Sequence, residues 1–106
     1  MEELFDKYRK KYSSHFMTAE QREKLRDWHE KVGRDGITLS QIDNWLFDAQ
    51  LLPFECSKSD SGLAFINFKS FALDFNQFLK FLELLSERIN LSVDDLHLRL
   101  LKVEKL

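Results

Sequence analysis

Apolar residues between positions 71 and 85 recur at the spacing of one broad helical face. They follow the i, i+3, i+4, i+7 pattern of an amphipathic helix, at Phe75, Phe78, Leu79, Leu82 and Leu85. Asp74 precedes the pattern and Gln77 follows it by three residues, which is the capping-box signal for a helix start. Six of the ten phenylalanines lie between Phe65 and Phe81. The pattern therefore predicts a helix here, with most of the core around it.

Weaker helical patterns occupy most of the remaining chain. We predict helices over residues 2–12, 18–32 and 38–50, and a last helix that begins after Ser92. Thr18 and Thr38 each have a glutamine three residues on, which again indicates a capping box. The predicted buried residues of these helices are Leu4, Phe5, Tyr8, Tyr12, Leu25, Trp28, Val32, Ile42, Trp45, Leu46, Leu96, Leu100, Leu101 and Val103.

The stretch from Leu51 to Ser70 gives the weakest signal. Pro53 ends the preceding helix, because proline removes a backbone donor and clashes with the previous turn. Residues Ser57–Gly62 resemble a polar turn or loop. The apolar run Leu63–Phe68 is short enough to be a helix or a strand. We favour a short helix that leads into the next loop.

The order of the predicted loops and helices indicates the fold class. A glycine-containing loop at 33–36 is followed by the isolated apolar residue Ile37 and then by a helix start, an order that resembles an EF-hand. Leu73 stands at the same place before the helix that begins after Asp74. We predict an all-α, EF-hand-like orthogonal bundle of about five helices in a single domain, residues 1–106, with a minimal two-stranded link between the loops.

Neither loop has the oxygen ligands that calcium requires. An EF-hand loop takes its ligands from positions 1, 3, 5 and 12, and its linking residue is position 8. With Ile37 at that position, the four ligand places hold Glu30, Val32, Arg34 and Gln41. With Leu73 there, they hold Ile66, Phe68, Ser70 and Gln77. Valine offers no ligand and Arg34 would bring a cation to the ion's place, so we expect no metal ion and no cofactor.

Composition excludes several broad classes of function. The chain carries 16 Lys and Arg against 18 Asp and Glu, a net charge of −2, which gives no overall attraction to nucleic acid or anionic lipid. No apolar stretch reaches the ~20 residues of a membrane span. Cys56 is the single cysteine, so the chain cannot form an internal disulfide. We expect a cytoplasmic protein that binds neither nucleic acid nor membrane.

No catalytic arrangement is visible in the sequence. Cys56 and the serines have no base in a recognisable local signature, and we interpret Cys56 as a structural or surface thiol. His29 is expected to face solvent, and His97 to lie on a helix surface or to be partly buried. Neither a GxxxxGK[ST] nor a GxGxxG phosphate loop occurs. The chain is therefore predicted not to be an enzyme.

Several stretches together form a pattern that is typical of one protein family. They are Leu4–Tyr8, Met17–Val32, Gly36–Thr38 leading into Ile42 and Asp43, Phe47, Leu73–Glu87, which is the most specific, and Ser92–Leu101. In these stretches the chain resembles the core domain of the tubulin polymerization-promoting protein family. The first loop is shorter than the family's, Leu51–Phe68 resembles an insertion, and the family's basic, glycine-rich C-terminal region is not among residues 1–106. Tubulin contacts cannot be carried over residue by residue.

The resemblance implies a non-catalytic, microtubule-associated binding module. Such a module would bind tubulin and stabilise or bundle microtubules, in the cytoplasm and at the cytoskeleton or a cilium. Because tubulin is acidic, a local basic face would have to steer the protein to it. The candidate residues are Lys7, Arg9, Lys10 and Lys11, although the same cluster could be an ordinary solvated helix face.

The alternative function is a calcium-independent, EF-hand-like adaptor. Such a domain would bind an amphipathic helix of another protein in an apolar groove. The concentration of aromatic residues between Phe65 and Phe71 motivates this hypothesis, with Phe65 and Phe68 as candidate contact residues. The same residues could instead fill the core. The sequence does not determine the oligomeric state.

Overall fold

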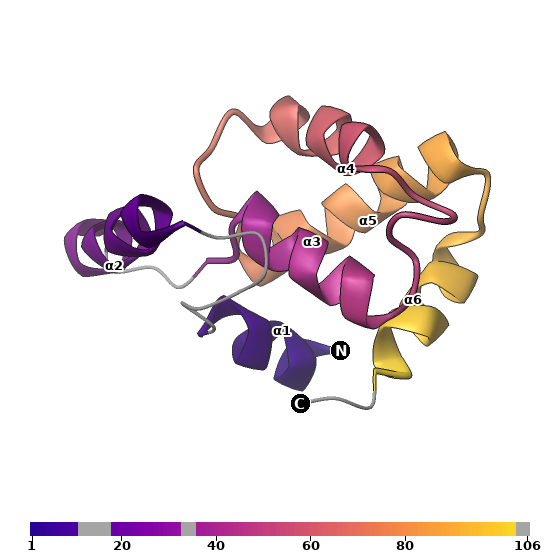
Figure 1. Ribbon diagram of the computed structural model, residues 1–106, viewed down its shortest axis with the longest axis horizontal. Helices are drawn as coiled ribbons and strands as arrows, with labels where there is room; N and C mark the ends of the chain where they lie inside the picture. Colours follow the sequence, from indigo (N-terminus) through magenta and orange to yellow (C-terminus); the bar gives the residue numbers. More distant parts are fainter. Residues whose placement is uncertain (11–17, 33–35, 104–106) are drawn as a thin grey trace.

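A computed structural model describes residues 1–10, 18–32 and 36–103, and these residues are organised by α-helices (Figure 1). The elements are α1 Glu2–Arg9, α2 Ala19–Val32, α3 Leu39–Asp48, α4 Lys58–Phe65, the 3-10 helix η1 Ile66–Phe68, α5 Phe75–Ile89 and α6 Val93–Leu101. The described part of the chain contains no strand. The all-α prediction is therefore confirmed, with six α-helices in the described residues where about five were expected.

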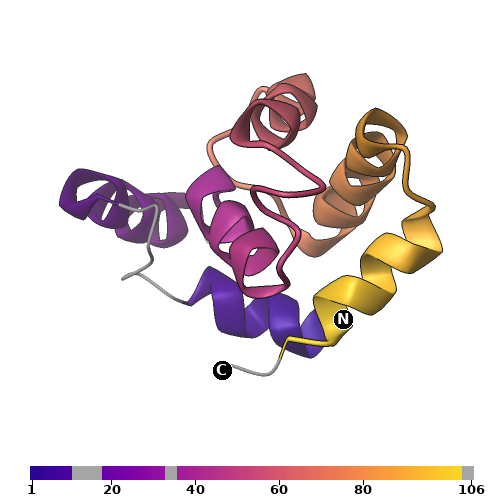
Figure 2. The ribbon, with the colours of Figure 1, turned by 45° about the vertical axis from the view of Figure 1, so that its right-hand side comes forward.

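Helix α5 has the caps and the buried face that its sequence predicts. The Asp74 side chain accepts a hydrogen bond from the Gln77 amide, and the Gln77 side chain accepts one from the Asp74 amide. Asn90 ends the helix in the left-handed conformation, with φ 58°. Buried residues along one face of the helix are Phe78, Phe81, Leu82 and Leu85. Helices α4 and α6 both pack against α5, which lies between them (Figure 2).

A stack of aromatic rings joins α1, α3 and α5 in the core. The rings of Tyr8 and Trp45 are nearly parallel with centroids 4.9 Å apart, and Trp45 and Phe78 follow at 5.2 Å. Such ring pairs stabilise a core beyond the area that they bury. The Trp45 indole also donates a hydrogen bond of 3.1 Å to the Leu100 carbonyl, which ties α6 to the same stack. Trp45 therefore contacts α1 through Tyr8, α5 through Phe78 and α6 through the Leu100 carbonyl.

Ile37 and Leu73, the residues at the two predicted linking positions, form one isolated bridge, so the predicted two-stranded link is not confirmed. Each backbone amide donates to the other's carbonyl, at 2.8 Å from Ile37 and 2.9 Å from Leu73, in one antiparallel bridge. Both residues are fully buried. A capping box starts directly after each one, at Thr38 with Gln41 and at Asp74 with Gln77. The loops are thus joined by a single pair of residues.

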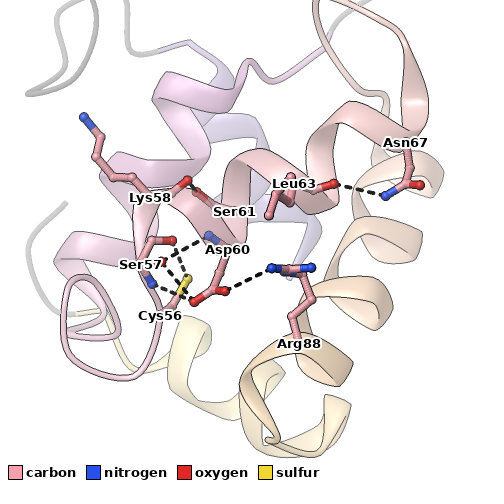
Figure 3. Close-up of polar contacts among 8 residues, drawn as sticks. All are labelled: Cys56, Ser57, Lys58, Asp60, Ser61, Leu63, Asn67 and Arg88. Carbon is pink, nitrogen blue, oxygen red and sulfur yellow. Dashed lines mark hydrogen bonds and ion pairs between the residues drawn. The ribbon is translucent and has the colours of Figure 1, made fainter.

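The interpretation of Ser57–Gly62 as a turn or loop is wrong, because these residues begin α4. Ser57 caps the helix: its side chain accepts from the Asp60 amide at 3.2 Å, and Asp60 accepts from the Ser57 amide at 3.1 Å (Figure 3). The buried face of α4 consists of the small residues Ser61 and Ala64. An apolar pattern does not mark such a face, which explains the error. The favoured short helix at 63–68 is confirmed as the end of α4 and η1.

Helix α2 lies at the side of the bundle and makes its own small core (Figure 1). Leu25 is fully buried against Ala72, with Trp28 partly buried beside them. His29, expected to face solvent, is half-buried, and its Nε2 lies 3.2 Å from both the amide nitrogen and the carbonyl oxygen of Gly36. The Thr18–Gln21 capping box is confirmed. The side chains of Tyr12 and Val32 lie outside the described residues.

Leu101 does not return to the core as predicted. Leu96 and Leu100 are buried, whereas Leu101 is 46% exposed. Leu96 and Leu100 are four residues apart and point inward together, so Leu101 is turned by about 100° from that direction. Val103 is partly buried against the main core, as expected.

Candidate binding surfaces

The predicted basic cluster on α1 is smaller than the sequence indicates. Lys7 and Lys10 are exposed, but Arg9 is held at 2.9 Å by Asp6 and only 12% of its side chain is exposed. Lys11 lies outside the described residues. Two lysines, rather than a continuous four-residue face, are therefore presented to solvent in the described part of this region.

An apolar groove runs along α4 and η1, and we call it the Phe65 groove. It consists of two adjoining recesses of about 410 and 250 Å³ that share Leu39, Phe65 and Ser70. One recess continues over Gly62, Ile66 and Lys69, and the other over Gln21, Thr38, Ser40 and Phe71. The groove thus runs between the first turns of α2 and α3 on one side and the end of α4 on the other.

Large apolar side chains lie open to solvent in and beside this groove. Ile66 and Phe71, which line the groove, are 67% and 37% exposed, and Leu63, which follows the lining residue Gly62 in α4, is 50% exposed. Scattered exposed apolar residues are ordinary, but several that gather around one groove indicate an interaction site. Ile66 and Leu39 were not among the predicted contact residues. Ile66 belongs to the apolar run at 63–68, and only the turn into η1 decides that it points outward.

The two predicted aromatic contact residues have different positions. Phe65 is half-buried, with its ring 6.3 Å from that of Phe81 in an edge-to-face arrangement, and it also lines both recesses. Phe68 is half-buried against the main core and lines neither recess. The structure therefore brings Phe65, but not Phe68, into the groove.

Hydrogen bonds fix the wall of the Phe65 groove. The Asn67 side-chain amide donates to the Leu63 carbonyl at 3.1 Å (Figure 3) and to the Ala64 carbonyl at 3.3 Å, which satisfies acceptors at the end of α4. Lys69 takes the left-handed conformation that reverses the chain after η1. Ser70 then donates to the Ala72 carbonyl at 2.8 Å. The groove is thus preformed rather than dependent on loose side chains.

A buried polar cluster joins α3 to α4 behind the groove. The Ser61 hydroxyl donates to Asp43 at 2.6 Å, and Asp43 is only 4% exposed. Burial raises the pKa of Asp43 to about 6, and the Ser61 hydrogen bond offsets part of that effect. Burial likewise raises the pKa of Cys56 to about 12, so its thiol stays protonated and is a poor nucleophile. The Ser61–Asp43 hydrogen bond therefore holds α4 against α3.

An ion pair also links α4 to α5. Arg88 lies 3.5 Å from Asp60, the partner of Ser57 in the capping box of α4 (Figure 3). Backbone hydrogen bonding at Ser57 is the main cause that lowers the pKa of Asp60. Because the pair is partly exposed, its contribution to stability is small.

Gln41 and Gln77 stand at the last calcium-ligand position of the two loops, and both already form hydrogen bonds in capping boxes. Gln41 accepts from the Thr38 amide at 3.0 Å and donates to the Arg9 carbonyl at 2.9 Å. Gln77 accepts from the Asp74 amide at 3.0 Å. In the described ranges, no three His, Cys, Asp or Glu side chains are grouped as metal ligands. Across those same ranges, every helix is too short or too polar to cross a membrane.

Comparison of this chain with protein-family models, with curated proteins and with solved structures finds no match. The resemblance to the tubulin polymerization-promoting family accordingly stays a prediction from the sequence.

Proposed function

We propose that the protein is a non-catalytic, calcium-independent adaptor that binds an amphipathic helix of another protein in the Phe65 groove. In this proposal α2 with α3 and α4 with α5 form two EF-hand-like halves. The Ile37–Leu73 bridge and the capping box after each of its residues support that pairing. The engaged glutamines support a role without calcium.

The exposure of Ile66 beside a preformed apolar recess is the observation that carries the proposal. Helix-in-groove recognition uses apolar anchors at i, i+3, i+4 and i+7 of the bound helix. Leu39, Phe65 and Ile66 offer the apolar surface for such anchors. Lys69 at one end would favour an acidic residue at the matching end of the partner helix.

A labelled model helix tests this proposal. The probe is a peptide of about 18 residues with leucine at helical spacing, glutamate and lysine elsewhere, and an acidic end. Fluorescence anisotropy should show saturable binding, and Ile66→Glu should weaken it at least about tenfold. Phe54→Glu, an exposed apolar residue outside the groove, is the matched control and should bind as the wild type does. Equal loss in both variants, or no binding, would contradict the proposal.

We also propose tubulin as a partner, which the family resemblance suggests. The exposed Lys7 and Lys10 on α1 favour it, because they offer positive charge to an acidic polymer. In a pelleting assay at low salt, the protein should sediment with microtubules, and Lys7→Glu with Lys10→Glu should reduce the bound fraction. The control is Lys24→Glu with Lys80→Glu, which makes the same charge change at other exposed lysines. If no protein sediments, this second function is wrong.

A further inference from the structure

The loop between α3 and α4 presents Phe54 to solvent on a fixed turn. Phe54 is 83% exposed, the largest value among the exposed large apolar side chains of the described residues. The amides of Glu55 and Cys56 donate to the Leu51 carbonyl at 2.9 and 3.0 Å, so the residues on both sides of Phe54 are held. The amides of Leu51 and Leu52 in turn donate to the Leu46 carbonyl of α3. An apolar ring is thus held in water by an ordered backbone.

A recess lies directly beside this ring. It has a volume of about 880 Å³, and Phe47, Leu52 and Pro53 provide its apolar lining. Phe47 is itself 44% exposed. Arg99 of α6 and Lys102, which caps the end of that helix, also line the recess. We call Phe54 and this recess together the Phe54 face; it lies where the loop after α3 approaches α6 (Figure 2).

Both signs of charge surround the Phe54 face. Glu55 of the loop pairs with Arg99 of α6, and Asp48 and Lys102 also line the recess. A two-fold interface places one patch against itself, so the patch must be complementary to its own rotated copy. Here an apolar projection lies beside a recess of mixed lining, in which Phe47, Leu52 and Pro53 are apolar, and acidic side chains lie beside basic ones.

We propose that the Phe54 face is a homodimer interface, and that its occupant is a second copy of this chain. Phe54 of each copy inserts into the recess of the other, beside that copy's own Phe54, and the Glu55 and Arg99 side chains lie at the rim. The Phe65 groove stays open in this dimer, because Leu39 and Phe47 are about 12 Å apart along α3. Each dimer therefore presents two grooves.

Analytical ultracentrifugation over about 1 µM to 1 mM protein tests the proposal. The wild type should approach a mass twice the 12.7 kDa of one chain as concentration rises. Phe54→Glu should raise the dissociation constant at least about tenfold, because it places a charge in the buried centre of the interface. Ile66→Glu makes the same change in the Phe65 groove and should dimerise as the wild type does. A mass of 12.7 kDa throughout, or equal loss in both variants, overturns the proposal.

A cross-linking variant gives an independent readout. The two Phe54 positions lie near each other across the two-fold axis, so Phe54→Cys should form a disulfide-linked dimer on air oxidation. Cys56 is buried and should not contribute to that product. Ile66→Cys, which is also exposed but lies outside the interface, should cross-link at least about tenfold more slowly. Equal rates for the two variants would show that the Phe54 positions do not meet.

Discussion

The two helix–loop–helix halves are alike after their loops and different before them. In each half a buried bridge residue, Ile37 or Leu73, is followed at once by a capping box and then by a helix with a large buried face. Trp45 and Phe78, one from each of these helices, stack on each other at 5.2 Å. The helices that follow the loops therefore build one common core.

The helices that precede the loops share no such arrangement. Helix α4 has eight residues and is locked to α3 through Ser61 and Asp43. Helix α2 has fourteen residues, but it is attached through Leu25, Trp28 and the contact of His29 with Gly36. The comparison teaches that the fold depends on α3 and α5, and that α2 can change with little effect on the rest.

The largest predicted effect is a loss of stability that is greater for a residue of the common core than for a residue of α2. Phe78→Ala should destabilise the protein by about 3–5 kcal/mol, because it leaves a cavity between Trp45 and Phe81. Trp28→Ala, on the partly buried face of α2, should cost only about 1–2 kcal/mol. Urea unfolding followed by circular dichroism measures both values. Equal losses would mean that α2 belongs to the same core as α3 and α5.

The second prediction concerns a polar residue in the first half. Asp43 stands six residues after Ile37, where the second half has Leu79 six residues after Leu73. Burial raises the Asp43 pKa from 3.8 to about 6, so the folded protein favours the neutral carboxyl. The stability that this group contributes is complete below pH 3.8 and is lost as the pH rises through about 6. At neutral pH the ionised form costs on the order of 3 kcal/mol.

Asp43→Asn should remove that loss. Its free energy of unfolding should exceed the wild-type value by about 1–3 kcal/mol at neutral pH and should differ little at about pH 4. Urea titrations across this pH range measure the difference, with the exposed Asp27→Asn as the control that keeps the wild-type profile. A variant that is less stable than the wild type at neutral pH would mean that the charged carboxylate is needed to hold α3 to α4.

The third prediction tests the contact between α2 and the bridge. A Cβ atom at Gly36 would lie 3.0 Å from both the Ala72 Cβ and the Trp28 ring, and 3.1 Å from the Leu73 carbonyl oxygen. Gly36→Ala should therefore displace α2 and destabilise the protein by about 1–3 kcal/mol. Gly62→Ala is the matched control: it meets no atom within 4 Å, and it should stabilise α4 by about 0.5–1 kcal/mol. Thermal unfolding of the two variants should shift in opposite directions.

The smallest predicted effect is that of calcium on either half. Gln41 and Gln77 are committed to capping, and the ligand positions before them include Arg34 and Phe68. Addition of about 1 mM Ca²⁺ should leave the melting temperature as it is in a chelator. A reproducible rise with Ca²⁺ would mean that one of the loops binds the ion.

Local signals made the common core predictable from the sequence. The capping pairs at Thr18, Thr38 and Asp74 act within one helical turn, so their residue types alone locate the helix starts. The broad apolar face of α5 identifies the central helix in the same way. Ile37 and Leu73 could be paired because each precedes such a start.

Features that depend on contacts between distant segments were not predictable. The Ser57–Asp60 capping pair is a local signal that could have located the start of α4, but the buried face of the helix was missed because Ser61 is polar and its hydrogen-bond partner Asp43 belongs to another helix. The position of His29 depends on the path of the chain at Gly36. The Phe65 groove forms only when α4, η1 and the start of α3 come together, so the sequence could suggest Phe65 but not Ile66 or Leu39.

The account depends most on the claim that the Phe65 groove receives a partner's helix. The most direct test is an NMR titration of ¹⁵N-labelled protein with the leucine, glutamate and lysine peptide. We predict saturable amide shifts that centre on Leu39, Ile66, Lys69 and Phe71, and that need at least about tenfold more peptide in the Ile66→Glu variant. Shifts that gather on α6 and the loop of Phe54, or that spread without saturation, would contradict the claim.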